Sequence, residues 1–212
     1  MRADLGRSSA RTSWIRTGSG MECWTGDGLW VERRSVVSLS EDLLAEGEPE
    51  REFNPGIASR LPRKRVGAGV LFRDADDRLM MVEPTYKPTL EIPGGLAEDG
   101  EAPLDACARE LREELGIEPP IGDLLVMDWV PAHGPWPDGL MLIFDGGILA
   151  QNDLAHIKLQ VEELSAYKFL TLEEIKPRVR PSFHRRLTSC LDAIAVGHPL
   201  YLQFGRIISD HR

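Results

Sequence analysis

Short runs of apolar residues, separated by polar or glycine- and proline-containing turns, predict β-strands through the middle of this chain. Residues 66–72 and 79–82 flank the polar turn 74–77, a pattern that predicts a hairpin. A brief strand at 90–92 is expected to stop at 93–95, where Pro-Gly-Gly disfavours both strand pairing and helix. Further strands are expected at 124–130, 140–149 and 167–170.

Apolar residues at helical spacing predict two helices. The first covers about residues 103–115, because Pro103 suits a first helical turn and Gly116 an exit. The second covers about residues 182–196. Strands on both sides of the first helix, with the second helix after them, predict an α/β fold in which a mixed β-sheet lies between helices. The helical positions expected in the core are Leu104, Ala108, Leu111, Leu115, Leu187, Cys190, Leu191 and Ile194.

The chain has 212 residues, enough for one domain with extensions. We expect the domain proper at residues 63–177, an N-terminal extension at 21–62, and a C-terminal helix and tail at 178–212. Residues 1–20 contain four arginines, several Ser and Thr and one acid, a composition that weakly resembles an organellar transit peptide. The preferred interpretation is a disordered tail, or a reading frame whose true start is Met21 and not Met1.

Composition and charge narrow the class of protein. The formal net charge of −9 argues against stable nucleic-acid binding, which needs a basic surface. No run of 18 apolar residues exists, so no membrane span is expected. The three cysteines are far apart and form no CxxC pair, which argues against a disulfide framework or a zinc site and favours the cytoplasm.

Three glutamates carry the strongest chemical signal. Glu110, Glu113 and Glu114 lie at i, i+3 and i+4, so a helix gathers them on one side. Like charges at this spacing destabilise a helix by about 0.2–0.5 kcal/mol per pair. Hard oxygen ligands gathered in this way suit Mg²⁺ or Mn²⁺. Taken alone, the pattern is more often a solvated acidic helix face.

The surrounding residues favour the metal site. The Pro-Gly-Gly at 93–95 brings backbone close to the start of the helix, where carbonyl groups suit a metal and amides suit phosphate. Glu101 precedes the helix and Arg109 adjoins the glutamates, and an arginine fork can orient a carboxylate. The joint spacing of these residues makes a plain acidic surface improbable.

The complete pattern resembles the Nudix box, G-x5-E-x7-R-E-U-x-E-E-x-G-U with U apolar, at every specified position. The matching residues are Gly95, Glu101, Arg109, Glu110, Leu111, Glu113, Glu114, Gly116 and Ile117. The resemblance to Nudix hydrolases covers roughly residues 63–177 and implies the Nudix fold, a mixed sheet sandwiched between helices. It also implies metal-dependent hydrolysis of a phosphoanhydride bond.

The resemblance assigns a role to each motif residue. It makes Glu110, Glu113 and Glu114 the metal ligands, with Glu110 and Glu114 the most direct, and Arg109 the group that orients a ligand carboxylate. Glu101 supports the loop or an outer-shell water, and Gly94 and Gly95 contribute backbone groups to the metal site. The implied cofactor is Mg²⁺ or Mn²⁺.

A general base is also required, and its place varies within the family. One usual place is a glutamate in a later loop, a few residues before an aromatic residue. Glu163 lies six residues before Phe169 and fits, with Glu162 as its neighbour. A charged turn ahead of a strand is an equally good interpretation of both. The other candidate bases are Glu113 and Glu114 themselves.

The motif says little about the substrate. We expect a nucleoside diphosphate linked to another moiety, such as ADP-ribose or a nucleotide sugar. The alternatives are a modified nucleoside triphosphate, and a non-catalytic regulatory module that binds a nucleotide. Tyr86 and Trp136 are candidate residues for stacking a base, with Trp136 in a proline-rich loop at 131–137, although ordinary packing is the commoner role for such residues.

Two further expectations concern surfaces. The extension before Arg63 either mediates a homodimer, as in nucleotide-sugar members that share a site, or caps the sheet independently. The basic run near the C-terminal helix is more simply a solvated helix face than a phosphate clamp. Its members are Arg178, Arg180, Arg185 and Arg186.

Overall fold

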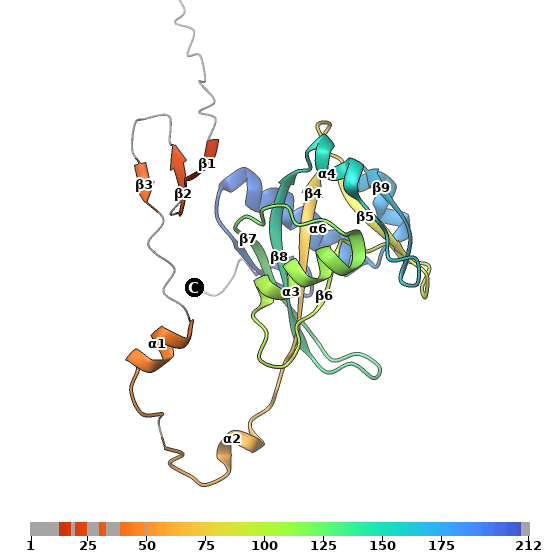
Figure 1. Ribbon diagram of the computed structural model, residues 1–212. Helices are drawn as coiled ribbons and strands as arrows, with labels where there is room; N and C mark the ends of the chain where they lie inside the picture. The colour runs from red at the N-terminus through yellow and green to blue at the C-terminus, as the bar shows by residue number, and fades with distance from the viewer. Residues whose placement is uncertain (1–12, 18–19, 25–29, 33–38, 50, 209–212) are drawn as a thin grey trace, which may run out of the picture. The chain divides into compact units, whose positions relative to one another are not determined.

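The computed structural model describes residues 13–17, 20–24, 30–32, 39–49 and 51–208, and the chain divides into two compact units, Met1–Leu61 and Pro62–Arg212 (Figure 1). The first unit has an antiparallel three-stranded sheet in the order β1-β2-β3, and two short helices follow it along the chain. Its elements are β1 (Ser13–Thr17), β2 (Gly20–Trp24), β3 (Trp30–Glu32), α1 (Leu39–Ala45) and α2 (Ile57–Arg60). Residues 1–12, 18 and 19 lie outside the described part, so the expectation of a tail stays a prediction.

The second unit is built on a mixed sheet in the order β11-β10-β7-β8-β4-β5-β9, with β6 beside β4. β4 pairs in parallel with β8 and β7 with β10, while the other neighbours are antiparallel. The strands are β4 (Arg65–Arg73), β5 (Leu79–Pro84), β6 (Gly94–Leu96), β7 (Leu124–Val130), β8 (Gly139–Ile148), β9 (Leu164–Leu170), β10 (Leu200–Gln203) and β11 (Arg206–Ile207).

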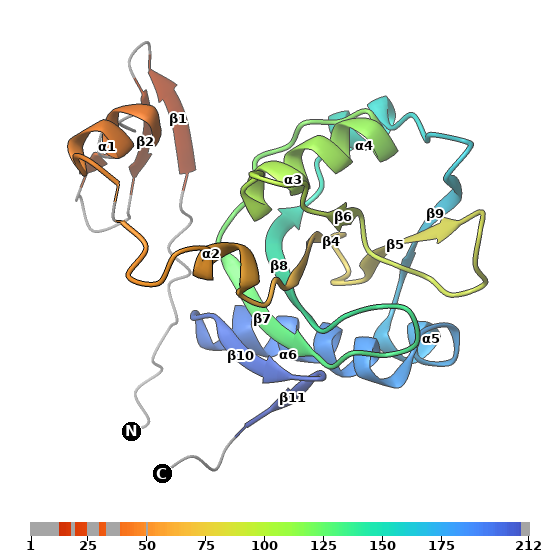
Figure 2. The same ribbon diagram turned by 90° about the horizontal axis from the view of Figure 1, so that it is seen from below.

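Helices cover both faces of this sheet (Figure 2). α3 (Pro103–Glu110) and the π-helical segment η1 (Leu111–Leu115) pack on one face, around Cys107 and Leu111. α6 (Pro181–Val196) packs on the other, around Leu187 and Cys190. Two cores therefore lie on either side of the sheet, which confirms the predicted α/β sandwich. The remaining helices are α4 (Gln151–His156), α5 (Leu172–Ile175) and the 3-10 turn η2 (Lys176–Arg178).

The first predicted helix differs from the structure in two respects. It is α-helical only to Glu110 and continues as a wider π turn, a feature found often at functional sites. Its buried stripe contains Cys107 in place of Ala108, and Leu104 is 43% exposed. Buried residues spaced by four, at 107, 111 and 115, suit a helix whose last turn has more than 3.6 residues.

The expected break at 93–95 is wrong, because Gly94–Leu96 is strand β6. It pairs with residues 67–69 of β4, whereas the expected strand at 90–92 makes one isolated bridge, from Glu91 to Val82. A Cβ at Gly94 would lie 2.3 Å from the carbonyl oxygen of Ala68, so only glycine allows this close approach. The same pairing places Gly94 and Gly95 beside the motif helix.

Several short elements were not expected, among them α4 and the C-terminal strands β10 and β11. β10 runs parallel to β7 and β11 pairs with β10, so two strands extend the edge of the sheet where only a tail was expected. Cys107 and Cys190 are buried free thiols, and the side chain of Cys23 lies outside the described residues. In the described part of the chain, no helix has the length and apolar character needed to span a membrane.

Candidate active site

Arg109 is the centre of the motif's ion pairs. Its Nε and Nη2 donate to the two carboxylate oxygens of Glu101 at 2.9 and 3.0 Å. Its Nη1 donates to Glu110 at 2.9 Å and to Glu113 at 3.0 Å, and Nη2 also reaches the Leu96 carbonyl oxygen at 3.1 Å. Hydrogen bonds from Arg109 lower the pKa of Glu101, so this carboxylate stays ionised and fixes the guanidinium.

Glu114 and Glu110 face the glycines of β6. Glu114 is 8% exposed, and its Oε2 accepts a hydrogen bond from the Gly94 amide at 3.0 Å. Burial raises the pKa of Glu114 to about 7, and the carboxylates of Glu110 and Glu163 add to the shift. Burial also raises the pKa of Glu110, against the opposing effect of Arg109. A Cβ at Gly95 would lie 2.1 Å from Glu110 Oε1, so that glycine makes room for the carboxylate.

These carboxylates have the chemistry that a hard divalent cation requires. Two of them are withdrawn from water, and their mutual repulsion is only partly offset by Arg109. Within the described residues, no three His, Cys, Asp or Glu side chains already surround one point at metal distances. The reason is visible in the contacts, because Arg109 holds Glu110 and Glu113. The three carboxylates fit a divalent cation as ligands once the side chains of Glu110 and Glu113 turn away from Arg109.

Glu163 lies close enough to Glu110 and Glu114 for its charge to raise the pKa of both. It is exposed and directly precedes β9, and its backbone carbonyl accepts from the Thr85 amide at 2.8 Å. The neighbouring carbonyl of Glu162 accepts from the Thr85 hydroxyl at 2.8 Å. The later-loop glutamate is therefore brought to the motif helix by pairing between β9 and β5.

A cavity of about 660 Å³ opens beside Glu114 and the glycines of β6. Both stacking candidates line it: Tyr86 beneath Lys87, with Nζ 5.4 Å from the ring centre, and Trp136 beneath the guanidinium of Arg65, also at 5.4 Å. Volumes of roughly 300–1,000 Å³ are usual for small-molecule sites. The cavity therefore joins the motif to aromatic and cationic side chains.

Four further residues of this wall matter for its chemistry, namely Arg180, Phe183, Arg186 and Phe204. Arg180 and Arg186 belong to the basic run, and the two phenylalanines were not singled out from the sequence. The solvated-face interpretation of the basic run is wrong for Arg186, which is buried and donates from Nε to Asp128 Oδ2 at 2.7 Å. Asp128 was the residue in the sequence that could have indicated this buried ion pair, because a carboxylate within an apolar strand requires a buried cation or hydrogen-bond donor.

A second member of the basic run is also paired. Arg178 donates to Glu83 at 2.6 Å, and Lys168 donates to the same carboxylate oxygen at 2.7 Å. These two hydrogen bonds lower the pKa of Glu83, with that from Lys168 the larger. Glu83 thus links β5 to β9 and to η2, near the start of β9, which Glu163 directly precedes.

Comparison with known proteins agrees with this geometry. A family model described as NUDIX domain matches residues 63–189. A "MutT-like protein" of Streptomyces ambofaciens is 30% identical over 154 residues, 71% of this chain and 88% of that protein. The crystal structure of a UDP-X diphosphatase has a TM-score of 0.56 at 14% identity, covering 80% of this chain and 77% of that one. The NUDIX domain of Shewanella oneidensis NrtR, complexed with ADP ribose, has a TM-score of 0.52 at 14% identity, covering 75% and 99%.

Proposed function

This chain belongs to the Nudix family and is a Nudix hydrolase, and we propose that it cleaves the phosphoanhydride bond of a nucleoside diphosphate linked to another moiety, such as ADP-ribose or a nucleotide sugar. One observation carries the proposal: buried Glu114 and the backbone of Gly94 and Gly95 line the same cavity as aromatic and cationic side chains. The ADP-ribose in the NrtR complex and the name UDP-X diphosphatase support this substrate class.

The metal in this proposal is Mg²⁺ or Mn²⁺. Glu110, Glu113 and Glu114 would hold it, with backbone groups of Gly94 and Gly95 beside them. When bound, such a cation neutralises diphosphate charge and lowers the pKa of an attacking water. Nudix hydrolases generally use divalent metal ions, and carboxylate oxygens are the donors that these two prefer.

The chain's own residues have separable roles in this proposal. Arg109 positions Glu110 and Glu113, and Glu101 in turn anchors Arg109. Glu163 takes the proton of the attacking water, with Glu113 and Glu114 as the alternative bases. The proximity of Glu163 to the buried glutamates supports it, as does its exposure, which leaves its carboxylate open to solvent.

A second candidate substrate is a nucleoside triphosphate, including modified ones. The 30% identity between this chain and the relative described as MutT-like supports nucleoside triphosphates as a second substrate class. A cytoplasmic location and a homodimer formed through the N-terminal extension stay predictions.

The decisive experiment separates and measures by chromatography the products formed from ADP-ribose, nucleotide sugars, dinucleotides and nucleoside triphosphates, each with Mg²⁺ or Mn²⁺, because cleavage between two linked moieties leaves two phosphomonoesters and no free phosphate. Glu114→Gln should abolish turnover of the preferred substrate. Glu118→Gln is the matched control, because this exposed glutamate follows the motif and pairs only loosely with Arg112 at 3.8 Å. Absence of turnover on every compound, or turnover that survives Glu114→Gln, would contradict the proposal. Full activity of Glu163→Gln would remove that residue as the base.

A further inference from the structure

The turn between β10 and β11 has an unfavourable backbone conformation. Its two residues, Phe204 and Gly205, have φ angles of 54° and 74°, both in the left-handed region. Two-residue hairpin turns of this kind favour Asn-Gly, because bulky side chains rarely adopt positive φ. Phe204 is therefore an unusual residue for this position. The turn lies beyond residue 189, where the match to the family model ends.

A buried anchor holds this turn in place. Asp128 on β7 is 0% exposed, and its two oxygens accept from the Gly205 amide at 3.0 and 2.9 Å. The same carboxylate accepts from Arg186, while the Phe204 amide donates to the Trp129 carbonyl at 2.8 Å. Arg185 Nη2 donates to the Phe204 carbonyl at 2.8 Å. The contacts to Phe204 and Gly205 all use backbone atoms of the turn, so none of them requires a phenyl ring.

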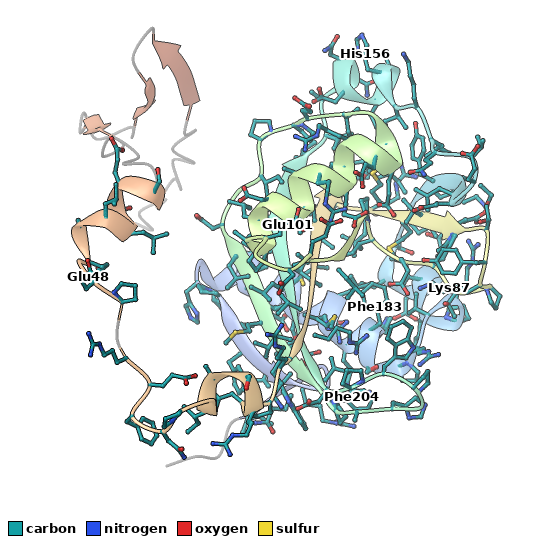
Figure 3. All side chains as sticks on the ribbon, turned by 60° about the horizontal axis from the view of Figure 1, so that its bottom comes forward. Glu48, Lys87, Glu101, His156, Phe183 and Phe204 are labelled. Carbon is teal, nitrogen blue, oxygen red and sulfur yellow. The ribbon has the colours of Figure 1, made fainter. Side chains whose placement is uncertain are left out.

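Phe204 is also one of the residues that line the cavity beside Glu114. Phe204 is 45% exposed and shares the cavity wall with Phe183 and Arg186, whose guanidinium lies 5.7 Å from the centre of the Phe183 ring. Figure 3 marks Phe183 on α6 and Phe204 in the β10–β11 turn. The guanidinium of Arg185 lies 6.0 Å from the centre of the Phe204 ring. A strained residue in the wall of a cavity suggests a binding role for its side chain.

We propose that Phe204 is a specificity-determining residue that stacks on a nucleobase of the substrate. This inference rests on the proposed function and deepens it. The wall formed by Phe183, Arg186 and Phe204 offers flat aromatic and guanidinium surfaces, which suit the face of a base. A sugar would need several hydrogen-bonding groups, and the two phenylalanines supply none. The backbone strain at Phe204 is kept because the ring contributes binding energy.

Stability and ligand binding should respond differently to a substitution at Phe204. Phe204→Asn retains the turn, its backbone hydrogen bonds and the anchor at Asp128, and it replaces a disfavoured residue with one that tolerates positive φ. The variant should melt at the same temperature as the wild type or higher. It should nevertheless bind a base-bearing ligand more weakly. A merely structural residue would lose stability and binding together.

The test compares AMP with ribose 5-phosphate by titration calorimetry, because the two ligands differ only in the base. The wild type should bind AMP more tightly, and Phe204→Asn should weaken AMP binding about 5- to 150-fold, the range of one base–aromatic stack. Ribose 5-phosphate should bind both proteins equally, and Phe204→Tyr should restore AMP binding. Tyr201→Asn is the matched control, since Tyr201 is an aromatic residue of β10 that is 48% exposed and is not among the residues lining the cavity.

Three results would overturn the inference. The first is a wild type that binds AMP no more tightly than ribose 5-phosphate. The second is unchanged AMP affinity in Phe204→Asn. The third is a Phe204→Asn variant with a lowered melting temperature and equal losses for both ligands. Failure of the proposed function is distinguishable, because it appears as absent hydrolysis while the base-dependent binding difference persists.

Discussion

Removal of one partner from the buried ion pair between Asp128 and Arg186 should strongly destabilise the second unit. The pair joins β7 to α6 across the sheet with an Nε–Oδ2 distance of 2.7 Å, and the two side chains are 0% and 11% exposed. Arg186→Met retains much of the packing of the arginine stem but removes the guanidinium. Among the described residues, Asp128 then keeps only the Gly205 amide as a hydrogen-bond partner, and it remains buried with its charge.

The expected cost follows from burial. Breaking a buried pair by removing one partner costs about 3–5 kcal/mol, because the remaining charge is uncompensated. For a unit of this size, each kcal/mol lowers the melting temperature by about 2–4 °C, so the variant should melt about 6–20 °C lower. In Asp128→Asn/Arg186→Met the charge is absent, and the Asn oxygen still accepts from Gly205. This double variant should recover most of the loss.

Urea denaturation followed by tryptophan fluorescence measures the double-mutant cycle. The two single losses should sum to well above the double loss, since the residues are coupled. Asp77→Asn is the control for an exposed pair, with Arg73 Nη1 at 3.2 Å from an aspartate that is largely exposed, and it should cost less than about 1 kcal/mol. Additive single losses, or single losses no larger than that of the control, would refute the reasoning.

Three further outcomes test other parts of the site. Because basic partners lower the pKa of Glu83, its stabilising contribution is present above the ordinary pKa and lost as pH falls through the lowered one. Urea denaturation should show Glu83→Gln less stable than the wild type at pH 7, with a difference that shrinks as the pH is lowered; a gap that widens with acid would contradict this. Gly95→Ala should lower kcat by at least about 100-fold, because its Cβ displaces Glu110. Gly100→Asn, which has open space around it and a left-handed backbone that asparagine tolerates, should leave kcat unchanged; equal rates would refute the crowding argument. Arg109→Lys keeps the charge but loses the fork and should reduce kcat about 10–100-fold, unless the fork has no positioning role.

Local patterns in the sequence predicted the longer elements well. The strand expected at 124–130 is β7 without change of bounds, and the expected helix at 182–196 is α6 with one more residue at its start. α6 buries one face along its length, so its helical periodicity reports burial directly, and β7 is an apolar run of strand length. β6 and β10 were missed because they are short and exist through pairing with β4 and β7, which the local pattern does not contain.

The sequence by itself determined the family and the motif's chemistry. Glu110, Glu113 and Glu114 come together through spacing along one helix, and that spacing is a local property that the chain carries wherever the helix packs. Only the tertiary structure decided that Glu114 is buried against β6, and that Arg186 is paired with Asp128, 58 positions away. Such contacts depend on which strands are neighbours in the sheet. The composition of the cavity wall therefore follows from the order of the strands, which local spacing does not encode.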